Sequence, residues 1–533
     1  MGVCQVVVVE MEKSMKLEKL SKNNLINING KKIICYGCSQ AYLKELSQKF
    51  PYILDNIIAV YDENNHSCAP IGFENRNFPV LTKDQLTEDT LQDAIWLILS
   101  DYFNEAYENL TLIEVIQKTL DVVYYFENYE TEIEMEYRRK YQNHCLENII
   151  LFRSGPHASA YIKGMDFSDN ARALFEYMLA NKFNETYEFV WLVKNPAEFS
   201  QKYSQYSNVH FVAYDWSISE KIEERDVYYK VLCLSKYLFF TDAYGFARNC
   251  RKDQIRIQLW HGCGYKTRVN FVPCEKRYEY MTVISDMYAN VYHKAFGLRE
   301  NQMLVTGYAK QDWLFSPLID VQRELELPNA DKYIFWLPTF RMAKQGLENL
   351  NQYIFDTQTG LPIVDSFEKC KILNEILTEN NTILVVKLHP FQDKSKIVNA
   401  ENVNMSAMKN IVFLDNDFLY EKDIQTNQIL GCADALISDY SSAAVDYMLL
   451  DRPIAFTLDD VEAYKESRGF FFENIEDWLP GKKLYTFDDF YYFIKEVCKG
   501  TDSTRTVRKG LMETMHKYHD NRNCERITAV LGI

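Results

Sequence analysis

Long hydrophobic runs are missing from this sequence. No stretch of its 533 residues approaches the roughly 20 consecutive apolar residues that a transmembrane helix needs. The apolar run Val6–Val9 is too short for the hydrophobic region of a signal peptide, and Glu10 and Glu12 follow it directly. We therefore expect a cytoplasmic protein without a transmembrane helix.

Ordered cysteine spacing and an excess of positive charge are missing as well. The 13 cysteines show no disulfide framework, which is typical of a protein of the reducing cytoplasm. Cys35 and Cys38 form a CxxC, but no second pair accompanies them for zinc, so we interpret them as small buried residues. The formal net charge of −16 argues against nucleic acid as a partner, while a local basic cleft for an anionic substrate stays compatible with it.

Short apolar strands alternate with helical segments along most of the chain, a pattern typical of doubly wound α/β domains. In residues 1–140, strand Lys32–Tyr36, a helix from Gln40 and strand Ile57–Tyr61 predict a βαβ unit, with Asp62 where a Rossmann domain holds a ribose. Only one glycine of the GxGxxG fingerprint is present, so the dinucleotide signal is weak. We interpret this region as a small Rossmann-like accessory domain.

Two further α/β regions follow, residues 141–325 and residues 326–533, and we expect them to face a common cleft. The tail from Ser503 to Ile533 is predicted to be helical and amphipathic. The predicted strands are Asn148–Phe152, Glu188–Val193, Val209–Val212, Tyr237–Asp242, Ile255–Trp260, Met281–Ser285 and Leu304–Tyr308 in the second region, and Tyr333–Leu337, Thr382–Lys387, Ile411–Leu414, Ala435–Ser438 and Pro453–Phe456 in the third.

Polar residues gather where these strands end. After Ala435–Ser438, the residues Ser441 and Ser442 precede an apolar helical segment, and a helix start after a strand can bind an anion. An ordinary capped helix is the alternative interpretation. Because ligands of parallel sheets bind beyond the carboxyl ends of the strands, the shared position favours one anionic-ligand cleft. Its candidate segments are Trp260–Gly262, Thr306–Asp312, Pro338–Arg341, Lys387–Pro390 and Ser438–Ser442.

Such a cleft offers what the transfer of a phosphate-bearing group needs, namely a base for the attacking hydroxyl and cations for developing charge. Each residue also has a plainer interpretation, because a histidine after a strand is commonly a hydrogen-bonded core residue and arginine is commonly a surface cation. The pattern alone leaves both open.

Seven segments over residues 148–530 resemble, in the same order, the CDP-glycerol glycerophosphotransferase family, the teichoic-acid and capsule polymerases and primases of bacteria. The resemblance implies a GT-B fold of two Rossmann-like halves facing a cleft. It also implies transfer of a polyol phosphate from a CDP-activated donor to an acceptor hydroxyl with release of CMP, and glycerol phosphate is the favoured polyol phosphate. The matching segments are Gln258–Arg268, Val305–Phe315, Leu337–Arg341, Lys387–Pro390, Ile437–Phe456, Tyr464–Gly481 and Tyr518–Ile527.

By the same resemblance, His261 is the base that deprotonates the acceptor, and Arg341 and His389 act with it as catalytic residues on the pyrophosphate. Lys310 stands where relatives usually have arginine. The forked guanidinium of arginine is thus replaced by the point charge of an ammonium. We expect in-line attack on the β-phosphorus, with positioning and charge neutralisation supplying most of the acceleration. The implied CDP- and phosphate-binding residues are Gly262, Lys310, Thr339, Lys387, Ser441, Ser442 and Asp446.

The resemblance further implies a lipid-linked or glycan acceptor and peripheral contact with the inner face of the plasma membrane, and it leaves a homo-oligomer open. No metal or other cofactor is required by any visible motif. Asp415-Asn416-Asp417 resembles a DxD metal motif, but we interpret it as a solvated acidic loop, with a divalent metal left open. The alternatives are a GT-B glycosyltransferase using a sugar nucleotide and a non-catalytic nucleotide-binding protein of the same fold.

Overall fold

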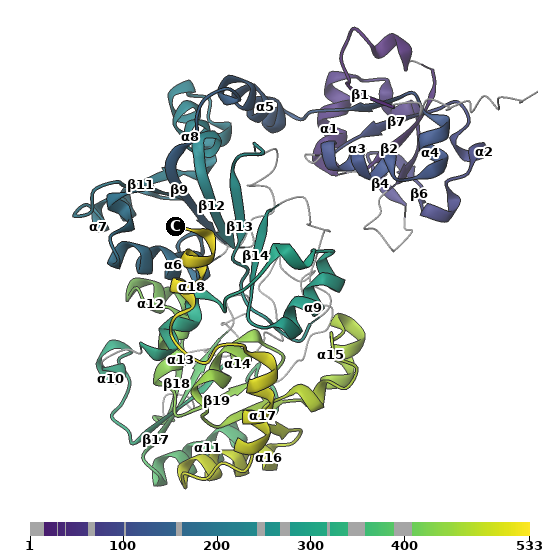
Figure 1. The fold of residues 1–533 in the computed structure, drawn as a ribbon. Helices are drawn as coiled ribbons and strands as arrows, with labels where there is room; N and C mark the ends of the chain where they lie inside the picture. The colour runs from purple at the N-terminus through teal and green to yellow at the C-terminus, as the bar shows by residue number, and fades with distance from the viewer. Residues whose placement is uncertain are drawn as a thin grey trace, which may run out of the picture. The chain divides into compact units, whose positions relative to one another are not determined.

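The computed structural model describes residues 15–28, 30–37, 39–61, 70–100, 103–155, 162–241, 251–266, 278–316, 320–338, 358–388 and 408–533. Within them the strands form three parallel sheets and one antiparallel hairpin (Figure 1). The chain divides into two compact units, the described parts of 1–145, 215–234 and 244–252, and those of 146–214, 235–243 and 253–533. The α/β class expected from the sequence is therefore confirmed.

The first unit holds a six-stranded sheet in the order β1-β8-β7-β2-β3-β6. Read from β2, the chain winds outward in both directions, as in a doubly wound sheet, and buried side chains cover both faces. The strands are β1 (Lys16–Lys19), β2 (Lys32–Tyr36), β3 (Ile57–Tyr61), β6 (Val80–Leu81), β7 (Ala94–Ile98) and β8 (Val122–Tyr125), with the hairpin β4 (Ile71–Phe73) and β5 (Arg76–Phe78) beside them. The helices are α1 (Gln40–Lys49), α2 (Glu88–Leu91), α3 (Phe103–Thr111), α4 (Glu114–Thr119), α5 (Tyr129–Tyr141) and α8 (Ile222–Leu234).

The second unit begins with a seven-stranded middle sheet in the order β11-β10-β9-β12-β13-β14-β15. Its strands are almost continuously apolar because helices cover both faces, and its core is rich in aromatic rings such as Phe152 and Trp191, stacked at 5.5 Å. The strands are β9 (Glu147–Ser154), β10 (Glu188–Val193), β11 (Val209–Ala213), β12 (Ser235–Thr241), β13 (Ile255–Gln258), β14 (Tyr280–Val283) and β15 (Met303–Val305). The helices here are α6 (Asp169–Ala180), α7 (Pro196–Lys202), α9 (Asp286–Phe296) and the 3₁₀ segment η9 (Ala309–Phe315).

The same unit holds the third sheet, in the order β18-β17-β16-β19-β20-β21. Helices α11 and α16 lie side by side over one of its faces (Figure 1) and supply much of its buried core. The strands are β16 (Lys332–Trp336), β17 (Thr382–Lys387), β18 (Ile411–Leu414), β19 (Ala435–Ser438), β20 (Ile454–Thr457) and β21 (Lys482–Leu484). The helices are α10 (Val321–Glu324), α11 (Phe367–Glu379), α12 (Asn416–Glu421), α13 (Thr426–Cys432), α14 (Ser442–Tyr447), α15 (Val461–Arg468), α16 (Phe487–Cys498), α17 (Arg505–Met515) and α18 (Asn523–Leu531).

The last helix, α18, leaves the third sheet and packs on the middle one. Cys524 and Ile527 are buried in the aromatic core of the middle sheet. The carboxylate of Asp312 in η9 accepts from the first two backbone N–H groups of the helix, Asn523 at 3.0 Å and Cys524 at 2.9 Å. This carboxylate caps the helix from outside, so the chain connects the two sheets of this unit twice.

None of the helices in the described residues is both long and apolar enough to cross a membrane.

Candidate functional site

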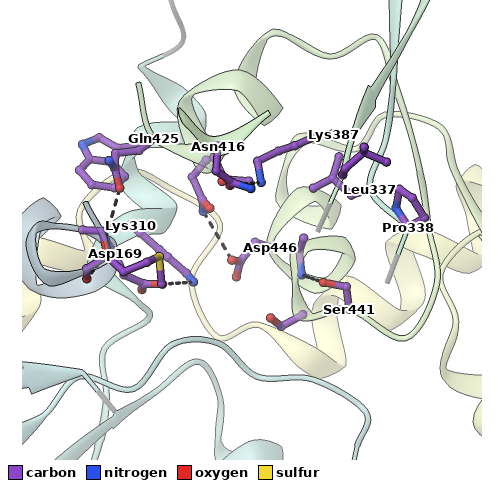
Figure 2. A pocket seen from close by; sticks show the side chains of 17 residues that line it. Asp169, Lys310, Leu337, Pro338, Lys387, Asn416, Gln425, Ser441 and Asp446 are labelled. Carbon is purple, nitrogen blue, oxygen red and sulfur yellow. Dashed lines mark hydrogen bonds and ion pairs between the residues drawn. The ribbon is translucent and has the colours of Figure 1, made fainter. Parts of the chain in front are cut away.

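A cavity of about 330 Å³ lies beyond the carboxyl ends of β16, β17 and β19, and segments of the middle sheet close its other side (Figure 2). In the third sheet β16 and β19 are neighbours from which the chain winds in opposite directions, which is the position where open α/β sheets bind ligands. The lining residues are Met165, Ser168, Asp169, Lys310, Trp313, Leu337, Pro338, Lys387, Leu388, Asn416, Gln425, Thr426, Asn427, Ser441, Ser442, Ala443 and Asp446.

Lys387, at the end of β17, is a buried cation on the wall of this cavity. Its ammonium donates to the side-chain oxygen of Asn416 at 3.1 Å. Burial lowers the pKa of Lys387 to about 8, because a charged group loses its hydration there. A phosphate group in the cavity would stabilise the ammonium form.

The start of α14 forms the neighbouring wall. The hydroxyl of Ser441 accepts from the backbone N–H of Ala443 at 3.3 Å and so caps the helix. Ser442 lies against the loop after β13: a Cβ on Gly262 would stand 2.6 Å from its Oγ, closer than such atoms approach. Gly262 also has φ +142°, so both the space and the backbone require glycine.

Asp446, Lys310 and Asp169 line the cavity as a charged cluster (Figure 2). The Lys310 ammonium lies 3.2 Å from the Asp169 carboxylate, and burial lowers its pKa less than the carboxylates of Asp169 and Asp446 raise it, so the net shift is upward. Burial raises the pKa of Asp446, whose oxygens accept from Gln311 at 2.7 Å and Asn427 at 3.4 Å. In this cluster two carboxylates face the Lys310 ammonium, whereas Lys387 has no carboxylate among its hydrogen bonds in the described residues.

His261 is the first residue after the short Leu259–Trp260 extension of β13, and it is half-buried. Its carbonyl oxygen accepts from the Lys310 ammonium at 2.5 Å, and its ring lies against that of Trp260 at 4.1 Å. Trp260 has φ +57°, an uncommon conformation for a bulky residue and one that costs on the order of 1–3 kcal/mol. Strain of this kind is found where a site must hold one side chain in place.

The structure thus brings together most of the residues that the sequence nominated. Thr339, Arg341 and His389 lie outside the described residues, and their roles stay predictions. The nominated residues that line the cavity or adjoin those that do are His261, Gly262, Lys310, Lys387, Ser441, Ser442 and Asp446.

Several lining residues were missed by the sequence analysis. Asn416 follows β18 and could have been found by the strand-end rule, but its segment was interpreted as a solvated acidic loop. In the structure Asp415 caps α12 by accepting from Phe418 N–H at 2.8 Å, Asp417 is exposed, and Asn416 faces the cavity. Asp169, Gln425 and Asn427 carried no signal, because single polar residues at helix starts are common.

Within the described residues no group of three or more His, Cys, Asp or Glu side chains is arranged to hold a metal ion.

The known proteins to which this chain is similar include polymerases and primases of teichoic acids. The teichoic acid ribitol-phosphate polymerase TarL of Staphylococcus aureus is 27% identical over 55% of this chain and 50% of its own length. A teichoic acid poly(glycerol phosphate) polymerase of Staphylococcus epidermidis is 24% identical over 84% of this chain and 60% of its own. The teichoic acid glycerol-phosphate primase of Bacillus subtilis is 25% identical over 56% and 72%. The chain spans 50% of the length of TarL and 59% of the length of TarK, a second teichoic acid ribitol-phosphate polymerase of Staphylococcus aureus.

Solved structures of the wall teichoic acid polymerase TagF share the fold. One matches with a TM-score of 0.54 and 18% identity over 76% of this chain and 93% of that one, and another with 0.55 and 17% over 81% and 97%. The model of the family described as CDP-glycerol:poly(glycerophosphate) glycerophosphotransferase matches residues 135–531. This match spans both sheets of the second unit and every described residue of the cavity, and the chain belongs to that family.

Proposed function

We propose that this chain moves a polyol phosphate from a CDP-activated donor to an acceptor hydroxyl and releases CMP. The favoured polyol phosphate is glycerol phosphate. One observation carries the proposal: the buried ammonium of Lys387 stands in a cavity at the carboxyl ends of the third sheet, and two other lining residues, Lys310 and Ser442, lie against the loop that bears His261. A dianionic diphosphate would supply the counter-charge that this ammonium lacks. The names of the relatives, which are polymerases and primases of polyol phosphates, support the choice of donor.

The proposed architecture is a GT-B fold preceded by an accessory domain. Residues 141–325 form the acceptor half with the base, residues 326–533 form the donor half, and residues 1–140 form the Rossmann-like accessory domain. The strand orders of the middle and third sheets support this assignment, since both wind outward from a central pair. The return of α18 to the middle sheet ties the donor half to the acceptor half.

In the proposed mechanism the imidazole of His261 takes the proton of the acceptor hydroxyl, whose oxygen attacks the β-phosphorus in line with the departing CMP. Lys387, together with Ser441 and Ser442, neutralises and orients the diphosphate. Arg341 and His389 are expected to stabilise charge in the transfer, and Thr339 to contact phosphate. Gly262, Lys310 and Asp446 shape the wall between the two halves.

The acceptor is proposed to be lipid-linked or a glycan of a teichoic acid or capsule-like polymer, reached by a cytoplasmic enzyme at the inner face of the plasma membrane. No metal enters this mechanism. Treatment with EDTA should therefore leave the rate of CMP release unchanged, and a loss that Mg²⁺ restores would show that the mechanism needs a metal.

The test supplies the full chain with CDP-glycerol, CDP-ribitol or UDP-sugars and a lipid-linked glycan acceptor, and it follows nucleotide release and acceptor mass. We expect CMP release and a gain of one or more polyol phosphates. UDP release would identify a glycosyltransferase, and binding of CDP-glycerol without turnover a non-catalytic protein. His261→Ala should lower kcat by about 100-fold or more. The matched control is His210→Ala, at an exposed histidine of β11, which should keep the wild-type rate.

A further inference from the structure

The loop Trp260–Tyr265 receives several hydrogen bonds from side chains outside itself. It belongs to neither a strand nor a helix, so its carbonyl groups need partners elsewhere. Side chains of the middle sheet's helices and segments supply partners for four of them. The donors are Asn170 Nδ2 to Trp260 O at 2.9 Å, Lys310 Nζ to His261 O at 2.5 Å, Tyr292 OH to Gly262 O at 3.4 Å and Tyr288 OH to Gly264 O at 3.5 Å.

These donors hold a backbone that would not adopt its shape unaided. Trp260 at φ +57° and Gly262 at φ +142° flank His261 on both sides. The Trp260 conformation is sparsely populated and persists only when its surroundings determine it, whereas glycine adopts the Gly262 φ without strain. The direction of the His261 side chain therefore depends on the residues that fix the two flanking peptides.

Asn170 connects the loop before His261 to the segment that carries Lys310. It lies in the first turn of α6, its side chain is 1% exposed, and it does not line the cavity. Its Nδ2 donates to Leu259 O at 3.3 Å as well as to Trp260 O, while its Oδ1 accepts from the backbone N–H of Lys310 at 3.0 Å. A side-chain amide carries both a donor and an acceptor, so one residue ties the end of β13 to the start of η9.

We propose that Asn170 is a positioning residue for the transfer reaction: it fixes the peptide before His261 and the segment that carries Lys310, and so holds the imidazole at the donor's phosphate. This inference rests on the proposed function, in which His261 is the base. Asn170 touches neither the substrate nor the reacting atoms in this role. Misplacing a catalytic group by about 1 Å costs on the order of 100-fold in rate.

The test compares Asn170→Ala and the isosteric Asn170→Asp, which keeps the acceptor for Lys310 N–H and removes the donor to Trp260 O. We expect kcat to fall by about 10- to 100-fold, while the Kd of CDP-glycerol, measured by calorimetry, stays within about twofold. The matched control is Asn184→Ala, because Asn184 is also buried in the middle sheet region and donates to a backbone carbonyl, that of Ser207 at 3.0 Å, but away from the loop. Its kcat should stay near that of the wild type.

A double-variant cycle separates positioning from general damage. If Asn170 acts through His261, Asn170→Ala should reduce kcat no further once His261 is already alanine. A further loss of tenfold in that background, or an unchanged kcat in the single variants, overturns the inference. Failure of the proposed function reads differently, because the wild type would then release no CMP, or His261→Ala would release it at the wild-type rate whatever residue stands at 170.

A second variant covers the case in which the Asn170 variants do not fold. Tyr292→Phe removes only the hydroxyl that donates to Gly262 O and keeps the packing of the ring, and we expect a several-fold loss of kcat at constant donor affinity. Its control is Tyr333→Phe. Tyr333 is a buried residue on β16, and its hydroxyl donates to Pro328 O at 2.9 Å. Equal kcat values for these two variants would overturn the proposal that outside donors position the loop.

Discussion

Replacing Lys387 with methionine should stabilise the fold and weaken donor binding at the same time. Burial lowers the pKa of this lysine to about 8, roughly 2.5 units below that of an unfolded lysine. At about 1.4 kcal/mol per unit, keeping the ammonium charged at pH 7 costs the folded state about 3 kcal/mol. The hydrogen bond to Asn416 at 3.1 Å returns about 1 kcal/mol of this. Lys387→Met should therefore raise the free energy of unfolding by about 2 kcal/mol.

The pH dependence of this gain has a defined sign. Because the folded-state pKa is lowered, the cost to the wild type is present in full below pH 8 and fades as the pH rises from about 8 to the unfolded pKa near 10.5. Urea unfolding of both proteins should show the largest difference at pH 7 and almost none at pH 10.5. The variant should also bind CDP-glycerol about 10- to 100-fold more weakly by calorimetry, since a charge-assisted hydrogen bond is lost.

Lys332→Met is the matched control for this experiment. Lys332, at the start of β16, donates to the backbone carbonyls of Val497 and Cys498, away from the cavity. Its replacement should lower stability and leave the Kd of CDP-glycerol unchanged. If Lys387→Met were destabilised like this control, the buried ammonium would be a structural cation and the reasoning would be refuted. Unchanged donor affinity in Lys387→Met would refute the placement of the diphosphate.

Two further changes test the loop and the last helix. Gly262→Ala should abolish transfer and weaken donor binding, because the new Cβ would stand 2.6 Å from Ser442 Oγ and residue 262 has φ +142°. CMP release measures the transfer and calorimetry measures the donor binding. A near-native rate of CMP release would contradict the close approach. Asp312→Ala should release α18, because the backbone N–H groups of Asn523 and Cys524 lose their acceptor at a cost of about 2–4 kcal/mol; limited proteolysis should then cut near the C-terminus before the rest of the chain, and an unaltered cleavage pattern would count against the cap.

Strands with a continuous apolar run were predictable from the sequence, including the edge strand β18 (Ile411–Leu414), whereas the short, lysine-rich edge strands β1 and β21 were not. β10, β17 and β19 begin and end at the predicted residues, because a strand covered on both faces reads as a continuous apolar run. β1 (Lys16–Lys19) and β21 (Lys482–Leu484) lie at edges, are short, and each contain two lysines. Such strands resemble loops in sequence, since charge at an edge protects it from pairing with other chains.

The site was predictable as far as strand ends reach. Lys387, Ser441 and Ser442 were nominated by that rule, and the cavity brings them together. Asn170 could not be found, because its role depends on the tertiary neighbours of a helix start and not on its spacing from any motif. For α18 the sequence predicted an amphipathic helix, but an apolar face states only that it is buried and not which sheet buries it.

The two connections between the middle and third sheets limit how these bodies can move. A single tether allows one body to swing about the other in any direction. Here the chain leaves the middle sheet after η9 and comes back through α17 to α18, whose first turn is fastened to Asp312. Two fastenings define a line, and rotation about that line is the motion that strains neither of them. We therefore expect any opening and closing of these two bodies to be a hinge rotation about this one axis. Such a rotation brings Gly262 back to the same contact with Ser442 each time the bodies close.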